Sequence, residues 1–395
     1  MVSGGPKGRI SVFGHDLRLL IPAALGPTYL NTATLGPTPT PASAAACAAE
    51  LKWEEIGPGH VPYYLEARDK ARQFAKRIEQ AMPRGTVSLV ENNSEAILRV
   101  LWGLSWDVGD ELITTDHEHP SLLFTIASLI RRFGIKVKVL TVDTAEPLQE
   151  QLRRVLSAKT KLVAMSHVSH LTGWQLPVEK LAVVIHKLNP RTRFLVDGAQ
   201  ALGNIPVHPF HSGADFYVFC GHKWMLAPPG WAGLWVRATR LSELTTLWPI
   251  SDCRFDAHDL ERGMWPLELD NGQGLEFGSR AWPRVVGWSI TWDYFEEEGF
   301  GHQFRYQLML AQQLVRALDH VRGFDVVMPP QPDYRPSALV TIRSQSWGAN
   351  LAQQLWSHNI IVKPVKEYQG VRIAFGLFNT VEDVNALLDA LRRLP

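Results

Sequence analysis

Two short apolar runs, each ending in a polar cluster, constrain the fold of this chain more than any other feature. FLVDGAQALG occupies residues 194–203, and DFYVFCGHKWMLAPPGWAGLWVR follows at 215–237. Continuous apolar runs of this length are typical of strands buried on both faces, as in parallel sheets. Because the carboxyl ends of parallel strands meet at one edge of the sheet, we expect Asp197 and Lys223 to lie close together there.

The surrounding sequence alternates strand-like and helical patterns. Strands are predicted at 86–90, 111–115, 135–141, 160–166, 192–196 and 215–219. Helices are predicted at 62–82, 94–104, 120–133, 145–157 and 178–188. This alternation predicts a mainly parallel sheet between helices. Residues 22–45, rich in Pro, Thr and Gly, are interpreted as an irregular surface segment.

The pattern changes after about residue 285. A long helical stretch at 286–321 precedes strands at 338–343, 360–364 and 371–375 and helices at 348–358 and 380–393. We therefore predict an α/β protein with a large domain at 20–285 and a smaller α/β domain formed by 1–19 and 286–395. A chain of 395 residues is long enough for two such domains.

Composition and charge exclude several classes of protein. The 40 basic and 39 acidic side chains give a formal net charge of +1, which argues against a nucleic acid or an anionic membrane as partner. No apolar run reaches the roughly 18–20 residues of a membrane-spanning helix, and the N-terminus does not have the pattern of a secretion signal. A cytoplasmic protein is expected. Cys47, Cys220 and Cys253 form no CxxC pair and no disulfide framework.

An acid and a lysine at neighbouring strand ends suit pyridoxal phosphate, which requires a lysine that forms a Schiff base and an acidic partner for its pyridinium nitrogen. Lys223 is predicted to be the catalytic lysine, because its aromatic and apolar neighbours would lower its pKa by partial burial. The alternative is a surface lysine at a strand end. Asp197 is predicted to hold the ring nitrogen, although an aspartate after a strand also serves as a helix N-cap.

A resemblance to a known family follows from these motifs. VDGAQ at 196–200 followed by GHKW at 221–224 resembles the class V aminotransferase and cysteine desulfurase group of fold-type I pyridoxal phosphate enzymes. The resemblance runs from YLNTATLGP at 29–37 to VRIAFG at 371–376, and it is strongest to the cystine/cysteine C–S lyase branch, with isopenicillin N epimerase-like proteins as further relatives. It implies a fold-type I transferase with a seven-stranded type of sheet, pyridoxal 5'-phosphate as cofactor, an amino-acid substrate and a homodimer with shared active sites.

The resemblance also implies which residues bind the cofactor phosphate. Asn93 and Ser94, in ENNSEA after a predicted strand, open a helix whose N–H groups can hold an anion, although Asn92 and Glu95 are also spaced as the cap and N3 residues of a helix capping box. His222 matches a phosphate ligand of the family. Cys220 replaces a serine of the family pattern, and its thiol is a weaker donor than a hydroxyl. Ser279 is expected to reach the phosphate in the other subunit.

Further roles concern the cofactor ring and the substrate. His119 is expected to stack on the ring and to relay protons, and Gln200 to donate to the phenolic oxygen. His170 stands where many desulfurases have an asparagine near that oxygen, which changes the hydrogen bonding. Arg372 matches the arginine that binds the substrate α-carboxylate, a group that a planar guanidinium recognises well. Asn31 and Arg280 are weaker candidates for substrate contacts.

The histidines also raise a metal-site alternative. His117 and His119, with His167 and His170, form HxH and HxxH patterns that could bind zinc. No thiol or carboxylate stands at a recognised zinc spacing, so no metal is predicted. His117 and His167 are interpreted as ordinary polar groups at strand ends.

The reaction type is narrowed by an absent cysteine. Desulfuration requires a cysteine nucleophile in a loop before the arginine that binds the carboxylate, and residues 344–371 contain none. GLSWDVGDELITTDHEHP at 103–120 also resembles the C–S lyase branch. The leading hypothesis is therefore β-elimination on cystine or a cysteine S-conjugate, giving pyruvate, ammonia and a thiol or persulfide. Transamination and epimerisation are alternatives, and a non-catalytic relative of the fold is a further one.

Overall fold

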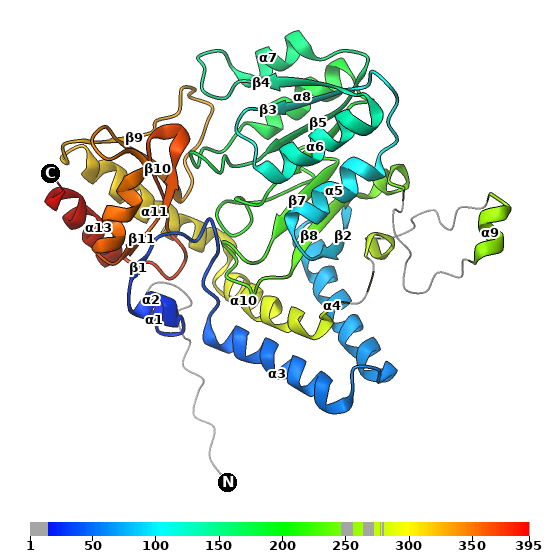
Figure 1. Ribbon diagram of the computed structural model, residues 1–395, viewed down its shortest axis with the longest axis horizontal. Helices are drawn as coiled ribbons and strands as arrows, with labels where there is room; N and C mark the ends of the chain where they lie inside the picture. Colours follow the sequence, from blue (N-terminus) through cyan, green and yellow to red (C-terminus); the bar gives the residue numbers. More distant parts are fainter. Residues whose placement is uncertain (1–14, 246–255, 264–271, 277, 279, 395) are drawn as a thin grey trace.

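The computed structural model describes residues 15–245, 256–263, 272–276, 278 and 280–394. Seven strands form the central sheet, in the order β2-β8-β7-β6-β5-β3-β4. Their bounds, in that order, are Gly85–Val90, Ala232–Arg237, Phe216–Cys220, Arg193–Asp197, Thr160–Ser166, Glu111–Thr115 and Lys136–Leu140. From β7 to β4 the strands are parallel, whereas β8 is antiparallel to both β7 and β2. The sheet is therefore mixed, with a parallel part that carries the motifs (Figure 1).

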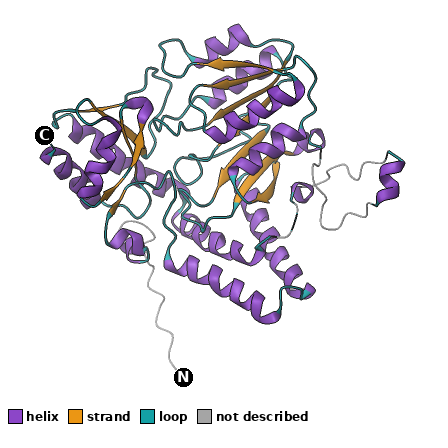
Figure 2. Ribbon diagram, viewed as in Figure 1, coloured by secondary structure: helices purple, strands orange, loops and turns teal. Residues whose placement is uncertain are grey.

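Helices cover both faces of this sheet (Figure 2). One layer contains α4 (Val61–Ala81), α7 (Leu148–Val155), α8 (Val178–Leu188) and α10 (Val285–Glu298). The other contains α5 (Asn93–Gly103) and α6 (Pro120–Phe133). Strand residues alternate between the two cores, so that Phe194 and Val196 lie in the first and Leu195 in the second. Because both faces are buried, the strands are apolar without alternation.

Most of the predicted elements of the large sheet are confirmed. The six strands and five helices predicted up to residue 219 occur with bounds within three residues of those expected. The antiparallel strand β8 was missed. The interpretation of residues 22–45 as irregular was wrong in part, because α2 (Pro22–Leu25) and the start of α3 (Thr40–Ile56) lie there. Pro41 obscured α3, yet a proline is tolerated in the first turn of a helix, where its missing N–H has no helical partner.

A second, antiparallel sheet has the order β12-β13-β10-β9. Its strands are Lys363–Val365, Gly370–Ala374, Leu339–Ser344 and Phe324–Val326. Helices α11 (Phe300–Leu318), α12 (Leu351–Ser357) and α13 (Val381–Arg393) contribute to its core. The long helix predicted at 286–321 is two helices, α10 and α11, because Gly299 between them has a φ of 76°.

The N-terminal segment packs on the small sheet. β1 (Thr28–Tyr29) pairs in parallel with β11 (Ile360–Ile361). Arg18 of α1 (His15–Leu19) forms an ion pair with Asp383 of α13, with an N···O distance of 2.8 Å. Helix α10, by contrast, contributes to the core of the large sheet. The predicted domain bounds stay a prediction.

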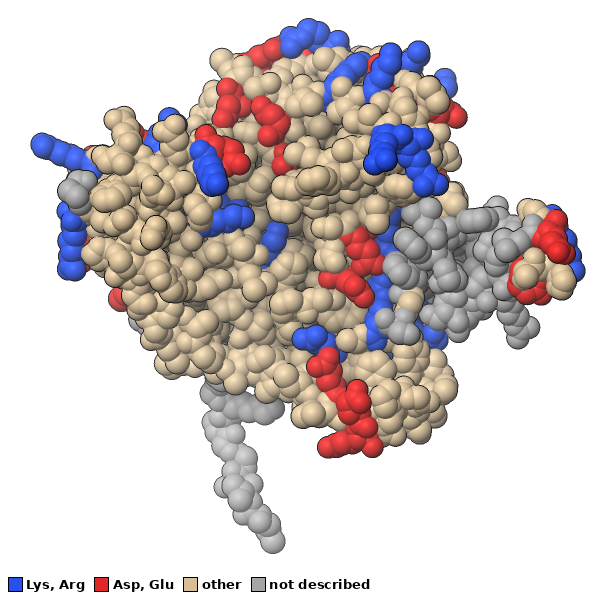
Figure 3. Space-filling model, viewed as in Figure 1, with Lys and Arg blue, Asp and Glu red and all other residues tan. Residues whose placement is uncertain are grey.

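The surface shown in Figure 3 carries charges of both signs, interspersed rather than gathered into one field. This agrees with the formal net charge of +1. None of the described helices combines the length and the apolar character that crossing a membrane requires.

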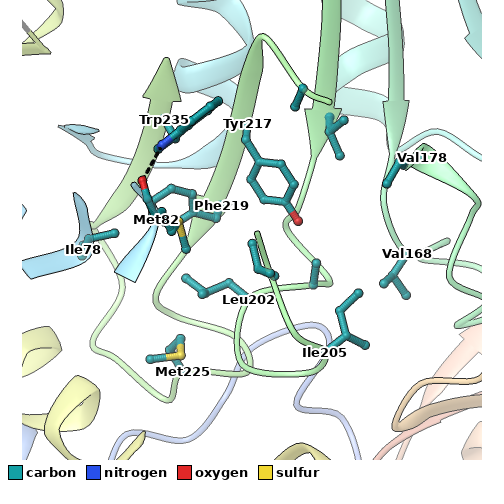
Figure 4. Close-up of a cluster of buried hydrophobic side chains, with 14 of the residues drawn as sticks. Ile78, Met82, Val168, Val178, Leu202, Ile205, Tyr217, Phe219, Met225 and Trp235 are labelled. Carbon is teal, nitrogen blue, oxygen red and sulfur yellow. Dashed lines mark hydrogen bonds between the residues drawn. The ribbon is translucent and has the colours of Figure 1, made fainter. Parts of the chain in front are cut away.

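Aromatic side chains of β7 and β8 pack among aliphatic side chains in the core of the large sheet (Figure 4). Phe219 and Trp235 are fully buried there. The indole Nε1 of Trp235 donates to the carbonyl oxygen of Met82 at 2.8 Å. A β-carbon at Gly85 would lie 2.2 Å from the same indole ring, so the edge strand β2 needs glycine where it crosses Trp235.

Replacing Trp235 by phenylalanine should destabilise the fold by roughly 1–3 kcal/mol, because the buried Met82 carbonyl loses its donor. The midpoint of urea unfolding measures this change. The matched control is Trp356→Phe, at a position that is 61% exposed, where the effect should stay within about 0.5 kcal/mol. Equal effects of the two substitutions would contradict the assigned role of Trp235.

Candidate active site

A cavity of about 250 Å³ opens at the carboxyl edge of β5, β6 and β7. Most of the residues that the sequence predicted for the cofactor line it. They are Asn93, Ser94, His119, His170, Asp197, Gln200, Cys220, His222 and Lys223. Ser279 lies outside the described residues, as does much of the segment 250–275. The remaining predicted residues, Arg372, Asn31 and Arg280, do not belong to the lining.

Asp197 is the buried acid of this cavity, at the end of β6. Its Oδ1 accepts hydrogen bonds from Nδ2 of Asn93 at 2.8 Å and from the backbone N–H of Ala199 at 2.9 Å. Its Oδ2 has no partner within the described part of the chain. Burial raises the Asp197 pKa, while the Ala199 N–H, the charge of Lys223 and Asn93 oppose that shift. The free oxygen is therefore suited to a cationic donor.

Lys223 lies in a tight loop after β7. Leu226, three positions on, has a φ of 57°, a left-handed conformation that is uncommon for leucine. The N-terminal segment packs against this loop through Gly36, whose N–H donates to the carbonyl oxygen of His222 at 2.8 Å. A β-carbon at Gly36 would lie 1.9 Å from the carbonyl oxygen of Lys223. Glycine is thus the residue that lets the two segments meet.

Gln200 is held from two sides. Its Nε2 donates to the carbonyl oxygen of Ala33, and its Oε1 accepts from the indole Nε1 of Trp224, both at 2.8 Å. One amide N–H therefore remains available to the cavity. The indole of Trp224 itself is fully buried beside Lys223.

The N-terminus of α5 forms the end of the cavity at which phosphate binding was predicted. Asn92 caps the helix, since its Oδ1 accepts from the N–H of Glu95 at 2.9 Å, so the capping interpretation is confirmed for this residue. Asn93 and Ser94, in the first turn, line the cavity. His222 also lines the cavity, and its buried Nδ1 has no partner among the described residues. Burial, then the charge of Lys223, lowers the His222 pKa to about 4.

Cys220 is fully buried at this end. Its Sγ lies 3.8 Å from the carbonyl oxygen of Ala199, to which its thiol can donate. Burial raises the Cys220 pKa to about 11. The thiol therefore stays protonated and interacts with the backbone, and its predicted contact with phosphate stays a prediction.

Two histidines of the lining contact each other. His119 caps α6, and its Nδ1 accepts from the N–H of Ser121 at 3.2 Å. The ring of His170 crosses that of His119 nearly at right angles, with centroids 5.3 Å apart. Burial, followed by the nearby cations Lys223, Lys363 and Arg372, lowers the His119 pKa to about 4. Burial first and His119 second lower the His170 pKa to about 3. Both rings are neutral at physiological pH.

Arg372 lies on β13 and is buried. One terminal nitrogen donates to the carbonyl oxygen of His170 at 2.6 Å, and the other donates to Oγ1 of Thr34 at 2.8 Å. Its Nε has no partner among the described residues. Burial lowers the Arg372 pKa to about 10. The guanidinium thus joins the small sheet to the cavity wall formed by Thr34 and His170.

Lys363 was missed by the sequence reasoning. It lies on β12 directly opposite Arg372 on β13. Burial, then the charges of Arg372 and Lys223, lowers its pKa. Lys363 comes close to Arg372 through the register of β12 and β13, and no local pattern in the sequence indicates this.

Glu118 was also missed, although it stands between two histidines that were considered. Its carboxylate accepts from Oγ1 of Thr115 at 2.5 Å and from Oγ of Ser166 at 2.6 Å. Burial raises the Glu118 pKa to about 7. Ser166 lines the cavity, so Glu118 fixes one of its walls from behind.

The weaker candidates contact their own chain. Oδ1 of Asn31 accepts from Oγ1 of Thr34 at 2.7 Å, which connects Asn31 to Arg372 indirectly. Arg280 is buried and donates to the carbonyl oxygen of Leu89 at 2.7 Å. The predicted roles of Asn31 and Arg280 toward substrate or partner stay predictions.

The two histidines interpreted as ordinary polar groups also have partners within the chain. His117 Nδ1 lies 2.9 Å from Oγ of Ser169, and His167 Nδ1 lies 2.8 Å from the hydroxyl of Tyr217. Among the residues the structure describes, no group of three or more His, Cys, Asp or Glu could hold a metal ion.

Comparison with protein families gives one match that spans most of the chain. The family model described as aminotransferase class-V matches residues 63–387. Among curated proteins, a probable cysteine desulfurase of Mycolicibacterium paratuberculosis is 28% identical over 349 residues, which cover 84% of this chain and 49% of that protein. A cysteine desulfurase of Haloferax volcanii is 26% identical over 348 residues, which cover 83% of this chain and 78% of that protein. The chain therefore spans about half the length of the first relative.

Solved structures share the fold. The cystine C–S lyase C-DES in complex with its product cysteine persulfide has a TM-score of 0.85 and 24% identity, with 95% of this chain and 99% of that chain covered. A C-DES mutant with glycine covalently linked to its pyridoxal phosphate cofactor has a TM-score of 0.86 and 24% identity, with 96% and 99% covered. The apo cysteine desulfurase of Thermococcus onnurineus has a TM-score of 0.82 and 22% identity, with 99% and 98% covered. The predicted fold class is confirmed.

Thiol alkylation should distinguish two of the cysteines. At mildly alkaline pH, Cys47, which is exposed, should be modified, whereas Cys220 should not, because burial raises its pKa to about 11 and the thiolate is the reactive form. Peptide mass spectrometry measures both modifications. In denaturant the two thiols should react alike, and rapid alkylation of Cys220 in the folded protein would contradict the description of its surroundings.

Proposed function

The chain belongs to the aminotransferase class-V family, and from that premise we propose that it is a pyridoxal phosphate enzyme that cleaves C–S bonds by β-elimination. Its substrate would be cystine or a cysteine S-conjugate, and its products pyruvate, ammonia and a thiol or persulfide. One observation favours β-elimination over desulfuration within the family. The segment 344–371, which leads to Arg372, contains no cysteine that could take sulfur from a substrate.

The residues of the cavity fit pyridoxal phosphate. Oδ2 of Asp197 is free for the ring N–H, and the partnerless Nδ1 of His222 lies with Asn93 and Ser94 at the N-terminus of α5, where an anion is favoured. Lys223 lies in the same cavity. When bound, the cofactor supplies an aldehyde that links to amino groups and a ring that accepts electrons from the substrate α-carbon.

Each of the residues around the cavity has a separate role in the proposed reaction. Asp197, a carboxylate in a buried site, keeps the proton on the ring nitrogen. Lys223 takes the proton from the substrate α-carbon, since it is the lysine that lines the cavity. Arg372 binds the α-carboxylate, for which its bonds to Thr34 and His170 position the guanidinium. His119 covers the cavity as a neutral ring.

The cations beside the site favour a substrate with more than one anionic group. Lys363 lies opposite Arg372, and its charge acts on His119 and His170. An α-amino acid has a single carboxylate, which Arg372 is suited to bind. The second carboxylate of cystine, or an acidic group of an S-conjugate, would be the counter-ion of Lys363.

Desulfuration is the main competing function, because the curated relatives are named as desulfurases. It needs a thiolate that reaches the substrate sulfur. Cys220 is near the site, but its buried thiol has a raised pKa and faces the carbonyl oxygen of Ala199. Cys47 is exposed on α3, and Cys253 lies outside the described residues. Transamination and epimerisation use the same binding groups and are the runner-up.

A homodimer is part of the proposal. Helix α6 starts beside His119 and presents apolar side chains to solvent, with Leu123 42%, Phe124 77% and Ile130 45% exposed. An apolar surface of this kind next to a site supports an interface. The cytoplasmic location and the absence of nucleic-acid and membrane partners stay predictions.

Product analysis tests the reaction. The purified protein loaded with pyridoxal phosphate should convert cystine and cysteine S-conjugates to pyruvate and ammonia, with release of a persulfide or thiol. The control is Lys223→Ala, which should abolish turnover because the base is lost. Alanine as the product would establish desulfuration, and an amino-group transfer or α-proton exchange without pyruvate would establish the runner-up.

Lys363→Met should raise KM for cystine about tenfold, which corresponds to the roughly 1.5 kcal/mol of a charge-assisted contact. The KM for S-methylcysteine, which has a single carboxylate, should change little. The matched control is Lys366→Met, an exposed lysine three residues on, which should alter neither value. Equal changes for both substrates would show that Lys363 does not distinguish them.

A further inference from the structure

His170 is fixed as one tautomer by the backbone. Its Nδ1 lies 3.2 Å from the carbonyl oxygen of His117. A carbonyl oxygen only accepts hydrogen bonds, so Nδ1 must carry the proton. Because the ring is neutral, Nε2 is left with a lone pair. The hydrogen bond of the His170 ring within the described residues is made through Nδ1, and His170 lines the cavity.

His119 has the opposite tautomer. Its Nδ1 accepts the backbone N–H of Ser121, so its proton must be on Nε2. The two crossed rings therefore offer the cavity different groups, an N–H from His119 and an acceptor nitrogen from His170. An asparagine in place of His170 would offer an N–H as well as an oxygen.

A second residue of the lining, Gln200, has a polar group that is not fully used. Gln200 has one amide N–H left after its bonds to Ala33 and Trp224. Arg372 donates to the backbone of His170 and to Thr34, another lining residue. The lining thus includes one unused donor, from Gln200, and one acceptor, from His170. A hydroxyl group, which donates and accepts at once, matches this pair, whereas a phenolate oxygen would meet the lone pair of His170.

The order of the substituents on pyridoxal phosphate limits where its hydroxyl could lie. The carbon that carries the aldehyde lies between the carbon with the hydroxyl and the carbon with the phosphate arm. If the N-terminus of α5 held the phosphate and Lys223 the aldehyde, the ring hydroxyl would be left for other polar groups of the lining, among which Gln200 has an unused donor and His170 an acceptor.

We propose that Nε2 of His170 accepts a hydrogen bond from the ring hydroxyl of the bound cofactor. This inference rests on the proposed function. His170 thereby stabilises the form in which this hydroxyl keeps its proton. This form absorbs at shorter wavelength than the form in which the proton has moved to the nitrogen linked to Lys223. The loaded enzyme should therefore show a larger share of the short-wavelength band than a variant with a donor at position 170.

The absorption spectrum of the loaded, substrate-free protein tests this inference. His170→Asn supplies an N–H and should raise the ratio of the long- to the short-wavelength band severalfold. His170→Phe, with neither donor nor acceptor, should give an intermediate ratio. The matched control is His186→Asn, because His186 also lies near a backbone carbonyl oxygen, that of Gly213, but is exposed and outside the cavity. Its spectrum should equal that of the parent protein.

Nitrogen NMR of the histidine-labelled protein provides a second readout that does not depend on absorption. The resonance that disappears in His170→Asn should report a protonated Nδ1 and an unprotonated Nε2. Cofactor content is measured separately, after release in alkali. A variant that binds the cofactor fully but leaves the band ratio unchanged, or a proton found on Nε2, would overturn the inference and leave the proposed function intact. A protein that takes up no pyridoxal phosphate would overturn both.

Discussion

The rest of the site depends on the buried carboxylate of Asp197. A buried charge is costly unless it is hydrogen-bonded, and here Asn93 and the N–H of Ala199 satisfy only one of its oxygens. Both of these hydrogen bonds reach Oδ1, which leaves Oδ2 for a further donor, and a cationic one suits it best. The hydrogen bond from Asn93 to Asp197 joins the N-terminus of α5 to the end of β6. One interaction therefore sets the distance between the groups suited to a phosphate and the group suited to a ring nitrogen.

The parallel part of the sheet brings these groups together, and the N-terminal segment completes them. β6 delivers Asp197 and β7 delivers Lys223 to the same edge. The segment before α3 then closes the site, since Gly36 packs on the loop of Lys223 and Ala33 accepts from Gln200. These contacts join residues far apart in sequence, and glycine at 36 is what lets the two backbones approach.

The sequence predicted the groups that follow strands directly, because two strand ends and a helix start have local signals. Asp197 and Lys223 were found in this way, whereas Asn93 was named from the family resemblance, and the strands themselves were located within a few residues. Lys363 was not predicted, since its place opposite Arg372 depends on the register of β12 and β13. The bond of His170 to His117 also escaped prediction, because it depends on how two loops pack. Helix α3 was hidden by prolines that a first turn tolerates.

The distribution of charge in the cavity limits what can bind productively. His119, His170 and His222 are all neutral because burial and neighbouring cations lower their pKa values. The neighbouring cations that lower these pKa values are Lys223, Lys363 and Arg372, and the anionic substrate of the proposed function would be their counter-ion. Arg372 donates to the carbonyl oxygen of His170. The ring of His170, in the same loop, in turn contacts the carbonyl oxygen of His117. In the proposed function, a carboxylate bound by Arg372 would meet a guanidinium that already holds this loop, so substrate binding and the position of His170 would be coupled.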